Sequence, residues 1–312
     1  FSYIFGEHDM KFGIDYQKDD LAQLFAGAKD GRYYFGDTGS GIDKFLANTP
    51  DQIQIYFGDV TYPNYDQPQT LTALYAQDTW RVNDNLTVTY GIRWGQTDNP
   101  DGLEHIFPEG EEVPDDDHFA PRVGFTYALG DEGKNVVRGA AGLFYSRTPS
   151  LLFASQVQEN GIYPNYGRVS VREGDPGFVP LGEQIPNENP PEITPSTSYV
   201  QPGYNDPETL RINLGYERQI GDTWATGVDL VYAEGSDLQS NVDANRTLTY
   251  DPYGRPLYLP DRPRDDIDNL FIRYSFGESE YTAATLNIRR RYTGRYQIQA
   301  HYTYSKDEDT DS

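Results

Sequence analysis

The chain has 312 residues, of which 49 are acidic and 25 are basic, giving a net charge of -24 at pH 7. This acidic balance, without any basic stripe, argues against nucleic acid as a partner. No apolar run reaches the roughly 18 residues of a membrane-spanning helix. The mean hydropathy of -0.72 still permits a membrane-embedded β-barrel, because only every second strand residue of a barrel faces lipid.

The first residue is Phe1, which already lies in a predicted strand, and no signal peptide precedes it. The last residues, 306–312, form an acidic run. We therefore expect this chain to be an internal piece of a larger protein.

Ten strand-like segments follow one another along the chain, and their connections alternate between short and long. Short turns are predicted at Gly6–His8, Asn83–Asn85, Gly130–Asn135, Gly221–Thr223 and Thr293–Gly294. Long connections are predicted at 19–68, 97–118, 148–208 and 235–279. Most of the segments have the length of about 9–11 residues that a tilted strand needs to cross a bilayer.

Most of these segments alternate apolar and polar residues at a period of two. In 86–95, one face carries Leu86, Val88, Tyr90, Ile92 and Trp94, and the other carries Thr87, Thr89, Gly91, Arg93 and Gly95. The same alternation occurs in 10–16, 210–220, 224–233 and 295–305 and is less clean in 119–129 and 136–147. In 69–82, Asp78 has the parity of Trp80, so we expect Asp78 near the lipid headgroups.

A soluble β-sandwich would show the same alternation, so other features must decide between the two folds. The strands exceed the 5–6 residues or so that are typical of soluble sheets, and the loops far exceed the usual length of about 4–6 residues. The 26 tyrosines also suit the aromatic girdles of a barrel. We predict an all-β fold in which 1–312 is a partial transmembrane antiparallel up-and-down β-barrel. It has about ten meander strands, short periplasmic turns and long extracellular loops.

Several segments also resemble strands of TonB-dependent outer-membrane receptors. The most specific is 74–94, LYAQDTWRVNDNLTVTYGIRW, in which Gln77, Asp78 and Trp80 form a Gln-Asp-x-Trp motif before a short turn. A Gly-x-Arg-Trp ending, Gly91–Trp94, follows on the next strand. Further similar segments are 8–16, HDMKFGIDY; 119–127, FAPRVGFTY; 137–149, VRGAAGLFYSRTP; and 302–306, YTYSK. Together they look most like the Oar-like branch of this family.

The resemblance implies a barrel of the bacterial outer membrane that binds a bulky ligand and imports it with an external energy source. The partners it implies are outer-membrane lipid and lipopolysaccharide, an unknown ligand, and TonB. TonB would be reached through an N-terminal plug domain and TonB box that we expect outside this chain. Two other readings stay open: a passive porin or adhesin-like barrel, and a soluble, secreted β-rich binding protein.

The sequence offers little catalytic or metal chemistry. The four histidines, His8, His105, His118 and His301, lack zinc-site spacing, and cysteine is absent. We read them as polar surface residues and expect neither an enzyme nor a cofactor. Asp115, Asp116 and Asp117 are candidates for a calcium site, as are the acidic runs 265–268 and 307–309. The simpler interpretation of these acidic runs is a solvated loop.

The connection 148–208 is crowded with proline between 174 and 207, so we expect that stretch to be extended and stiff. Four aromatic residues along the connection are candidates for ligand binding: Tyr163, Tyr166, Tyr199 and Tyr204. The alternative is a rim loop without a binding role.

Overall fold

The structure is a computed structural model of the whole chain. It describes all residues except 24–27, 29, 37–40, 58–64, 112, 131–132, 163–166, 186–195, 253–255, 260 and 311–312.

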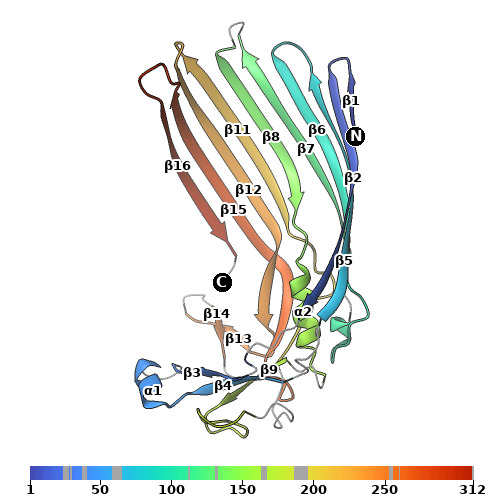
Figure 1. Ribbon diagram of the computed structural model, residues 1–312, viewed down its shortest axis with the longest axis vertical. Helices are drawn as coiled ribbons and strands as arrows, with labels where there is room; N and C mark the ends of the chain where they lie inside the picture. Colours follow the sequence, from blue (N-terminus) through green and yellow to red (C-terminus); the bar gives the residue numbers. More distant parts are fainter. Residues whose placement is uncertain are drawn as a thin grey trace.

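Ten strands form one curved antiparallel wall, in which each strand pairs with its neighbours along the chain (Figure 1). They are β1 (Ser2–Phe5), β2 (His8–Gln23), β5 (Tyr65–Arg81), β6 (Leu86–Asp98), β7 (Asp116–Leu129), β8 (Asn135–Tyr145), β11 (Glu208–Ile220), β12 (Trp224–Asp243), β15 (Leu270–Arg290) and β16 (Ile298–Asp309). The predicted meander of about ten strands is confirmed.

The short hairpin connections lie together at one end of the wall, at the top of Figure 1. Local chemistry explains these turns. Gly6 and Gly221 have φ values of 58° and 59°, a region that favours glycine. The Asn83 side chain accepts hydrogen bonds from the backbone N–H groups of Asn85 and Leu86, both at 2.9 Å, and so closes the turn between β5 and β6.

At the other end the strands run further than the sequence pattern predicts. β12 has 20 residues and β15 has 21, and they remain paired out to Asp243 and Phe271. The connection between them is therefore 244–269 rather than 235–279. The added part of β12, 236–243, is mainly polar, whereas the added part of β15, 270–279, carries Leu270 and Ile272, which are buried. Neither stretch presents the continuous exposed apolar face of a lipid-facing strand.

The two faces of the wall differ as the alternation predicts. Leu214, Leu230 and Leu286 lie on one face and are 46–58% exposed. On the opposite face, Asp229 accepts hydrogen bonds from Arg138 at 2.8 Å and from Asn287 at 2.6 Å. Since the apolar face of such a wall contacts lipid, the polar face lines the barrel interior.

Asp78 shares the apolar face with Trp80, yet it is only 6% exposed. Its carboxylate is 2.6 Å from His8 Nδ1 and accepts a hydrogen bond from Tyr90 Oη at 2.8 Å. The His8 ring stacks on the Trp80 ring from the neighbouring strand. Polar and aromatic side chains of adjacent strands thus cover the carboxylate near the short-turn end of the wall.

The long connections contain their own elements, at the bottom of Figure 1. These are β3 (Arg32–Tyr34), α1 (Gly41–Ala47), β4 (Gln52–Phe57), the 3-10 helix η1 (Pro108–Gly110), α2 (Ser150–Gln158), β9 (Gly167–Arg172), β10 (Thr197–Val200), β13 (Leu248–Tyr250) and β14 (Pro256–Tyr258). β3, β4 and β9 form a small sheet that runs across the end of the wall (Figure 1). β10 adds to the start of β15 in parallel, which departs from the meander.

Candidate functional site

Two long connections that are distant in the sequence share a small core. Ile53 and Ile55 of β4 pack against Val169 and Val171 of β9, and all four side chains are at most 1% exposed. β4 and β9 are also paired as antiparallel strands. The connection between β2 and β5 is therefore bound to the connection between β8 and β11.

A second core is built around α2. Phe153 of this helix is fully buried among Leu103, Val113, Val200 and Tyr204. Leu103 and Val113 belong to the connection between β6 and β7. This core therefore joins a third connection to the first two.

A third core involves the connection between β12 and β15. Ile267, Leu270 and Ile272 are 2–8% exposed and contact Phe107 and Tyr199. All four long connections are consequently packed together. We call this packed unit, which comprises the described parts of the four connections, the cap.

Two of the four aromatic residues proposed from the sequence as ligand-binding are described by the structure, and both lie in the cap. Tyr204 is 6% exposed in the core around α2, and Tyr199 is half-buried against His105 and Phe107. Tyr163 and Tyr166 lie outside the described residues. Both described rings are used in packing in this arrangement of the cap, and their role in ligand binding stays a prediction.

His105 is not the polar surface residue expected from the sequence, because it is 5% exposed inside the cap. The Phe107 N–H donates to its Nδ1 at 3.0 Å, which places the proton on Nε2. Nε2 lies 3.2 Å from the Ser198 carbonyl oxygen, a suitable acceptor. Burial lowers the pKa of His105, although these backbone hydrogen bonds oppose the effect. A neutral imidazole thus joins two connections of the cap.

We expect the cap to loosen as the pH falls. An exposed histidine takes up a proton below about pH 6.5, whereas buried His105 resists protonation, so acid favours the open state. Hydrogen exchange of the segment 103–110, corrected for intrinsic rates, should accelerate between about pH 7.5 and 5.5. His105→Gln should abolish this pH dependence, and His301→Gln should retain it. An unchanged profile in His105→Gln would contradict the assignment.

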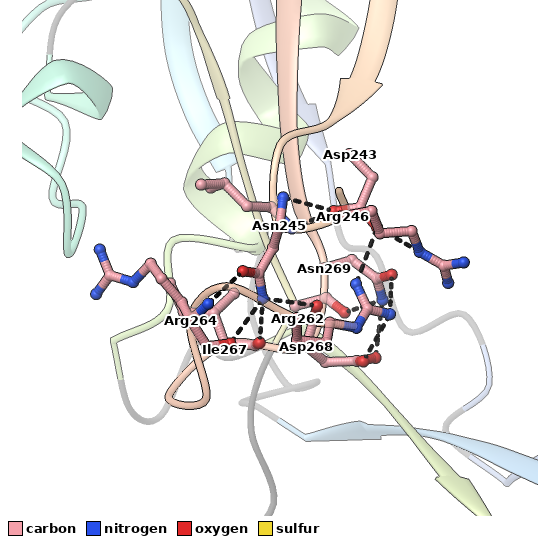
Figure 2. Close-up of polar contacts among 10 residues, drawn as sticks. Asp243, Asn245, Arg246, Arg262, Arg264, Ile267, Asp268 and Asn269 are labelled. Atoms are coloured by element: carbon pink, nitrogen blue, oxygen red, sulfur yellow. Dashed lines mark hydrogen bonds and ion pairs between the residues drawn. The ribbon is translucent and has the colours of Figure 1, made fainter. Parts of the chain in front are cut away.

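Asn245 anchors the connection between β12 and β15 (Figure 2). Its side chain is 1% exposed, and its Nδ2 donates to the carbonyl oxygens of Arg264 and Ile267 at 3.0 and 2.6 Å. Its Oδ1 accepts from the Arg264 N–H at 2.9 Å. Beside it, Arg262 bridges Asp243 and Asp268, each at 3.0 Å. One buried amide and one arginine therefore hold both ends of this loop together.

Asn245→Asp should open this loop. The carboxylate keeps the shape of the amide but cannot donate to the two carbonyl oxygens, and each buried group left unpaired costs about 1–3 kcal/mol. Hydrogen exchange of 262–272 should rise, while exchange in the wall strands stays as in the wild type. Asn241→Asp, at an exposed position on β12, is the matched control and should have no effect. Equal exchange in both variants would show that Asn245 is not the anchor.

The acidic runs considered as metal sites have different partners in the structure. Asp266 pairs with Arg264 at 2.6 Å, and Glu308 pairs with Lys306 at 2.7 Å. Asp115 accepts the Asn99 N–H at 2.7 Å, and Asp117 lies 3.4 Å from the Trp94 indole nitrogen. Asp116 alone of the run 115–117 meets a histidine.

The group around Asp116 lies where β7 begins and the connection from β8 returns to β11. His118 Nε2 is 3.3 Å from Asp116 Oδ2 and 3.4 Å from Asp206 Oδ2. Asp206 Oδ1 accepts hydrogen bonds from the Thr148 N–H at 2.8 Å and hydroxyl at 2.6 Å. The ring of Tyr145 stacks on His118 with a centroid distance of 4.1 Å. We call Asp116, His118 and Asp206 the rim triad.

His118 lies on the loop side of Phe119, which pairs with Trp94 of β6. Burial works to lower the pKa of His118, but the hydrogen bonds and charges of Asp116 and Asp206 outweigh it and raise the pKa to about 9. The imidazolium therefore holds two carboxylates together at neutral pH. Asp206 was not among the residues singled out from the sequence, where its only signal is a carboxylate just before a predicted strand.

Comparison with known proteins shows which family has a wall of this kind. The family model described as outer membrane beta barrel domain matches residues 1–105 and 110–312. The FrpB iron transporter from Neisseria meningitidis superposes with a TM-score of 0.53 at 14% identity, covering 99% of this chain and 34% of that one. The transporter YddB from Escherichia coli gives 0.58 at 11% identity, covering 99% and 32%. The copper transporter OprC gives 0.51 at 10% identity, covering 98% and 37%.

This chain thus spans about a third of the length of these solved structures. No curated protein matches it. In the part of the chain that the structure describes, no helix is long and apolar enough to span a membrane. The predicted outer-membrane location and the resemblance in fold to outer-membrane receptors are confirmed, and a soluble secreted protein is excluded. The chain belongs to the outer membrane beta barrel domain family.

Proposed function

We propose that this chain is a section of the barrel of a TonB-dependent transporter, which binds a bulky ligand on the outside of the cell and imports it with energy delivered through TonB. The observation that carries the proposal is the cap, in which four long connections form three cores and a shared sheet at the loop end of the wall. Loops fixed on a rigid scaffold are where binding residues concentrate.

The interior face supports the same proposal. A hollow of about 260 Å³ on this face is lined by Arg138, Glu217, Asp229, Asn287 and Arg289, among others. Arg138 lies 3.9 Å from Glu217, and Arg289 lies 3.5 Å from the same carboxylate. Both signs of charge are thus present on the wall, and they suit a hydrated passage for a polar ligand rather than a packed apolar core.

The named structural neighbours suggest first probes for the cargo. FrpB is described as an iron transporter and OprC as a copper transporter. We propose a chelated metal as the first ligand class to test, while carbohydrate, peptide and small-protein cargo remain alternatives. Tyr199 and Tyr204 would then act indirectly, by shaping the cap against which the ligand lies.

The test is uptake by cells that express the full-length protein. Labelled ferric siderophore and labelled copper complexes serve as probes, with a strain lacking the protein as the control. Uptake of a transported probe should stop when the proton gradient is collapsed or when TonB is deleted. Uptake that persists under both conditions would overturn the energised mechanism and leave the passive porin in its place.

A further inference from the structure

We propose that the rim triad, Asp116, His118 and Asp206, binds one divalent transition-metal ion, for which Zn²⁺ is the probe. The proposal does not depend on the transport function. Its donor atoms all lie within 4.8 Å of one another, one from each residue. Two of the residues belong to the start of β7 and the third to the chain that returns to β11, so a bound ion would fasten the cap to the wall.

The donor spacing fits direct coordination. In a tetrahedral zinc site, metal–nitrogen and metal–oxygen bonds of about 2.0–2.2 Å place neighbouring donor atoms roughly 3.4 Å apart. His118 Nε2 lies 3.3 Å from Asp116 Oδ2 and 3.4 Å from Asp206 Oδ2. An ion can therefore take the place of the proton on His118 Nε2 among these three atoms, with small side-chain movements and release of that proton to water.

The surroundings hold the ligands as metal sites require. Both hydrogen bonds from Thr148 go to Asp206 Oδ1, which leaves Oδ2 directed toward His118. The Asp206 N–H donates to Asp116 Oδ2 at 2.6 Å, and the Tyr145 ring fixes the plane of the imidazole. Outer partners of this kind orient metal ligands and tune their affinity.

The donor set indicates the class of ion. One imidazole and two carboxylates suit zinc and similar first-row divalent ions, whereas calcium prefers six to eight oxygen donors. Asp206 is 5% exposed, and the side chains of His118 and Asp116 are 16% and 18% exposed. The site is sheltered but reachable, so water or a ligand group can complete the coordination. This site differs from the calcium site considered for the run 115–117, because only Asp116 of that run takes part.

The experiment uses the full-length protein, purified in detergent and stripped of metal with a chelator. Calorimetric titration with Zn²⁺ should show one more site in the wild type than in His118→Gln or Asp206→Asn. Thr148→Val keeps the ligands but removes the hydroxyl, and it should weaken zinc binding by about 10–100-fold. Asp115→Asn and Asp117→Asn are matched controls from the same acidic run and should bind zinc as the wild type does.

Two further measurements keep the result independent of folding defects. The heat-dependent gel mobility of a folded barrel shows which variants are intact. The visible spectrum of the Co²⁺-loaded wild type shows whether the ion has a low coordination number and a nitrogen ligand. Equal zinc stoichiometry in the wild type and in folded His118→Gln would overturn the proposal. So would a loss of the site in Asp117→Asn, or a Co²⁺ spectrum of a fully hydrated ion. None of these results would bear on TonB-dependent uptake.

Discussion

Leu214→Arg is expected to impair assembly of the barrel, destabilising the folded state in the membrane by about 2–4 kcal/mol. Leu214 lies at the middle of β11 and is 48% exposed on the apolar face. Its partners across the two neighbouring strands are Gly139 and Leu230, which offer no charge to an arginine. The guanidinium would therefore face lipid near the midplane of the bilayer.

The matched control is Thr285→Arg, which introduces the same charge at the same level of the wall but on the interior face. Thr285 of β15 pairs directly with Asp229 of β12, one residue along from the row that contains Leu214 and Leu230. The new arginine therefore lies beside a carboxylate. Urea titration of full-length protein folded into lipid vesicles should show a large loss of stability for Leu214→Arg and little for Thr285→Arg. Equal stability of the two variants would mean that the lipid-facing side of the wall is assigned wrongly.

The wall could be predicted from the sequence because lipid and water impose a period of two on each strand. In 86–95 this signal is complete, and the structure places it on β6 as expected. The signal ends where lipid ends. The outer part of β12, 236–243, has only two apolar residues, Leu238 and Val242, so its pattern is weak, and the sequence suggested a loop there.

The cap could not be predicted, because its stability comes from contacts between distant segments. β4 and β9 are short, and the pairing of Ile53 with Val171 becomes visible only when the two connections meet. In α2 the apolar residues are consecutive rather than spaced along one face: Leu151 is 57% exposed, while its near neighbour Phe153 is fully buried. Helical periodicity therefore did not predict this helix.

The candidate site shows the same limit. Asp116 was selected as part of an acidic run, whereas its partners in the structure are His118 at close range and Asp206, 90 residues along the chain. His105 was read as a surface residue because its neighbours in the sequence, Glu104 and Ile106, do not reveal its contacts with Ser198 and Tyr199, more than 90 residues away. Long-range contacts decide the state of both histidines.

A disulfide that locks the cap is expected to abolish ligand uptake, reversibly. Gln54 of β4 and Ser170 of β9 are directly paired, and antiparallel partners have Cα atoms about 4.5–5.5 Å apart, a distance that a disulfide bridges. The chain has no cysteine of its own, so Gln54→Cys with Ser170→Cys introduces a single defined bond. If a bulky ligand passes the cap when β4 and β9 separate, the bond blocks that movement.

Uptake of the transported probe should fall by about tenfold or more in the oxidised double variant, because a closed lid holds the passage shut. Reduction should restore it, and each single variant should transport as the wild type does under both conditions. Ligand binding to intact cells is measured beside uptake, to tell whether the disulfide prevents binding or prevents opening of the cap. Retained binding with lost uptake places the block at opening of the cap. Normal uptake through a fully oxidised cap would contradict this prediction and show that the pairing of β4 with β9 survives the transport cycle.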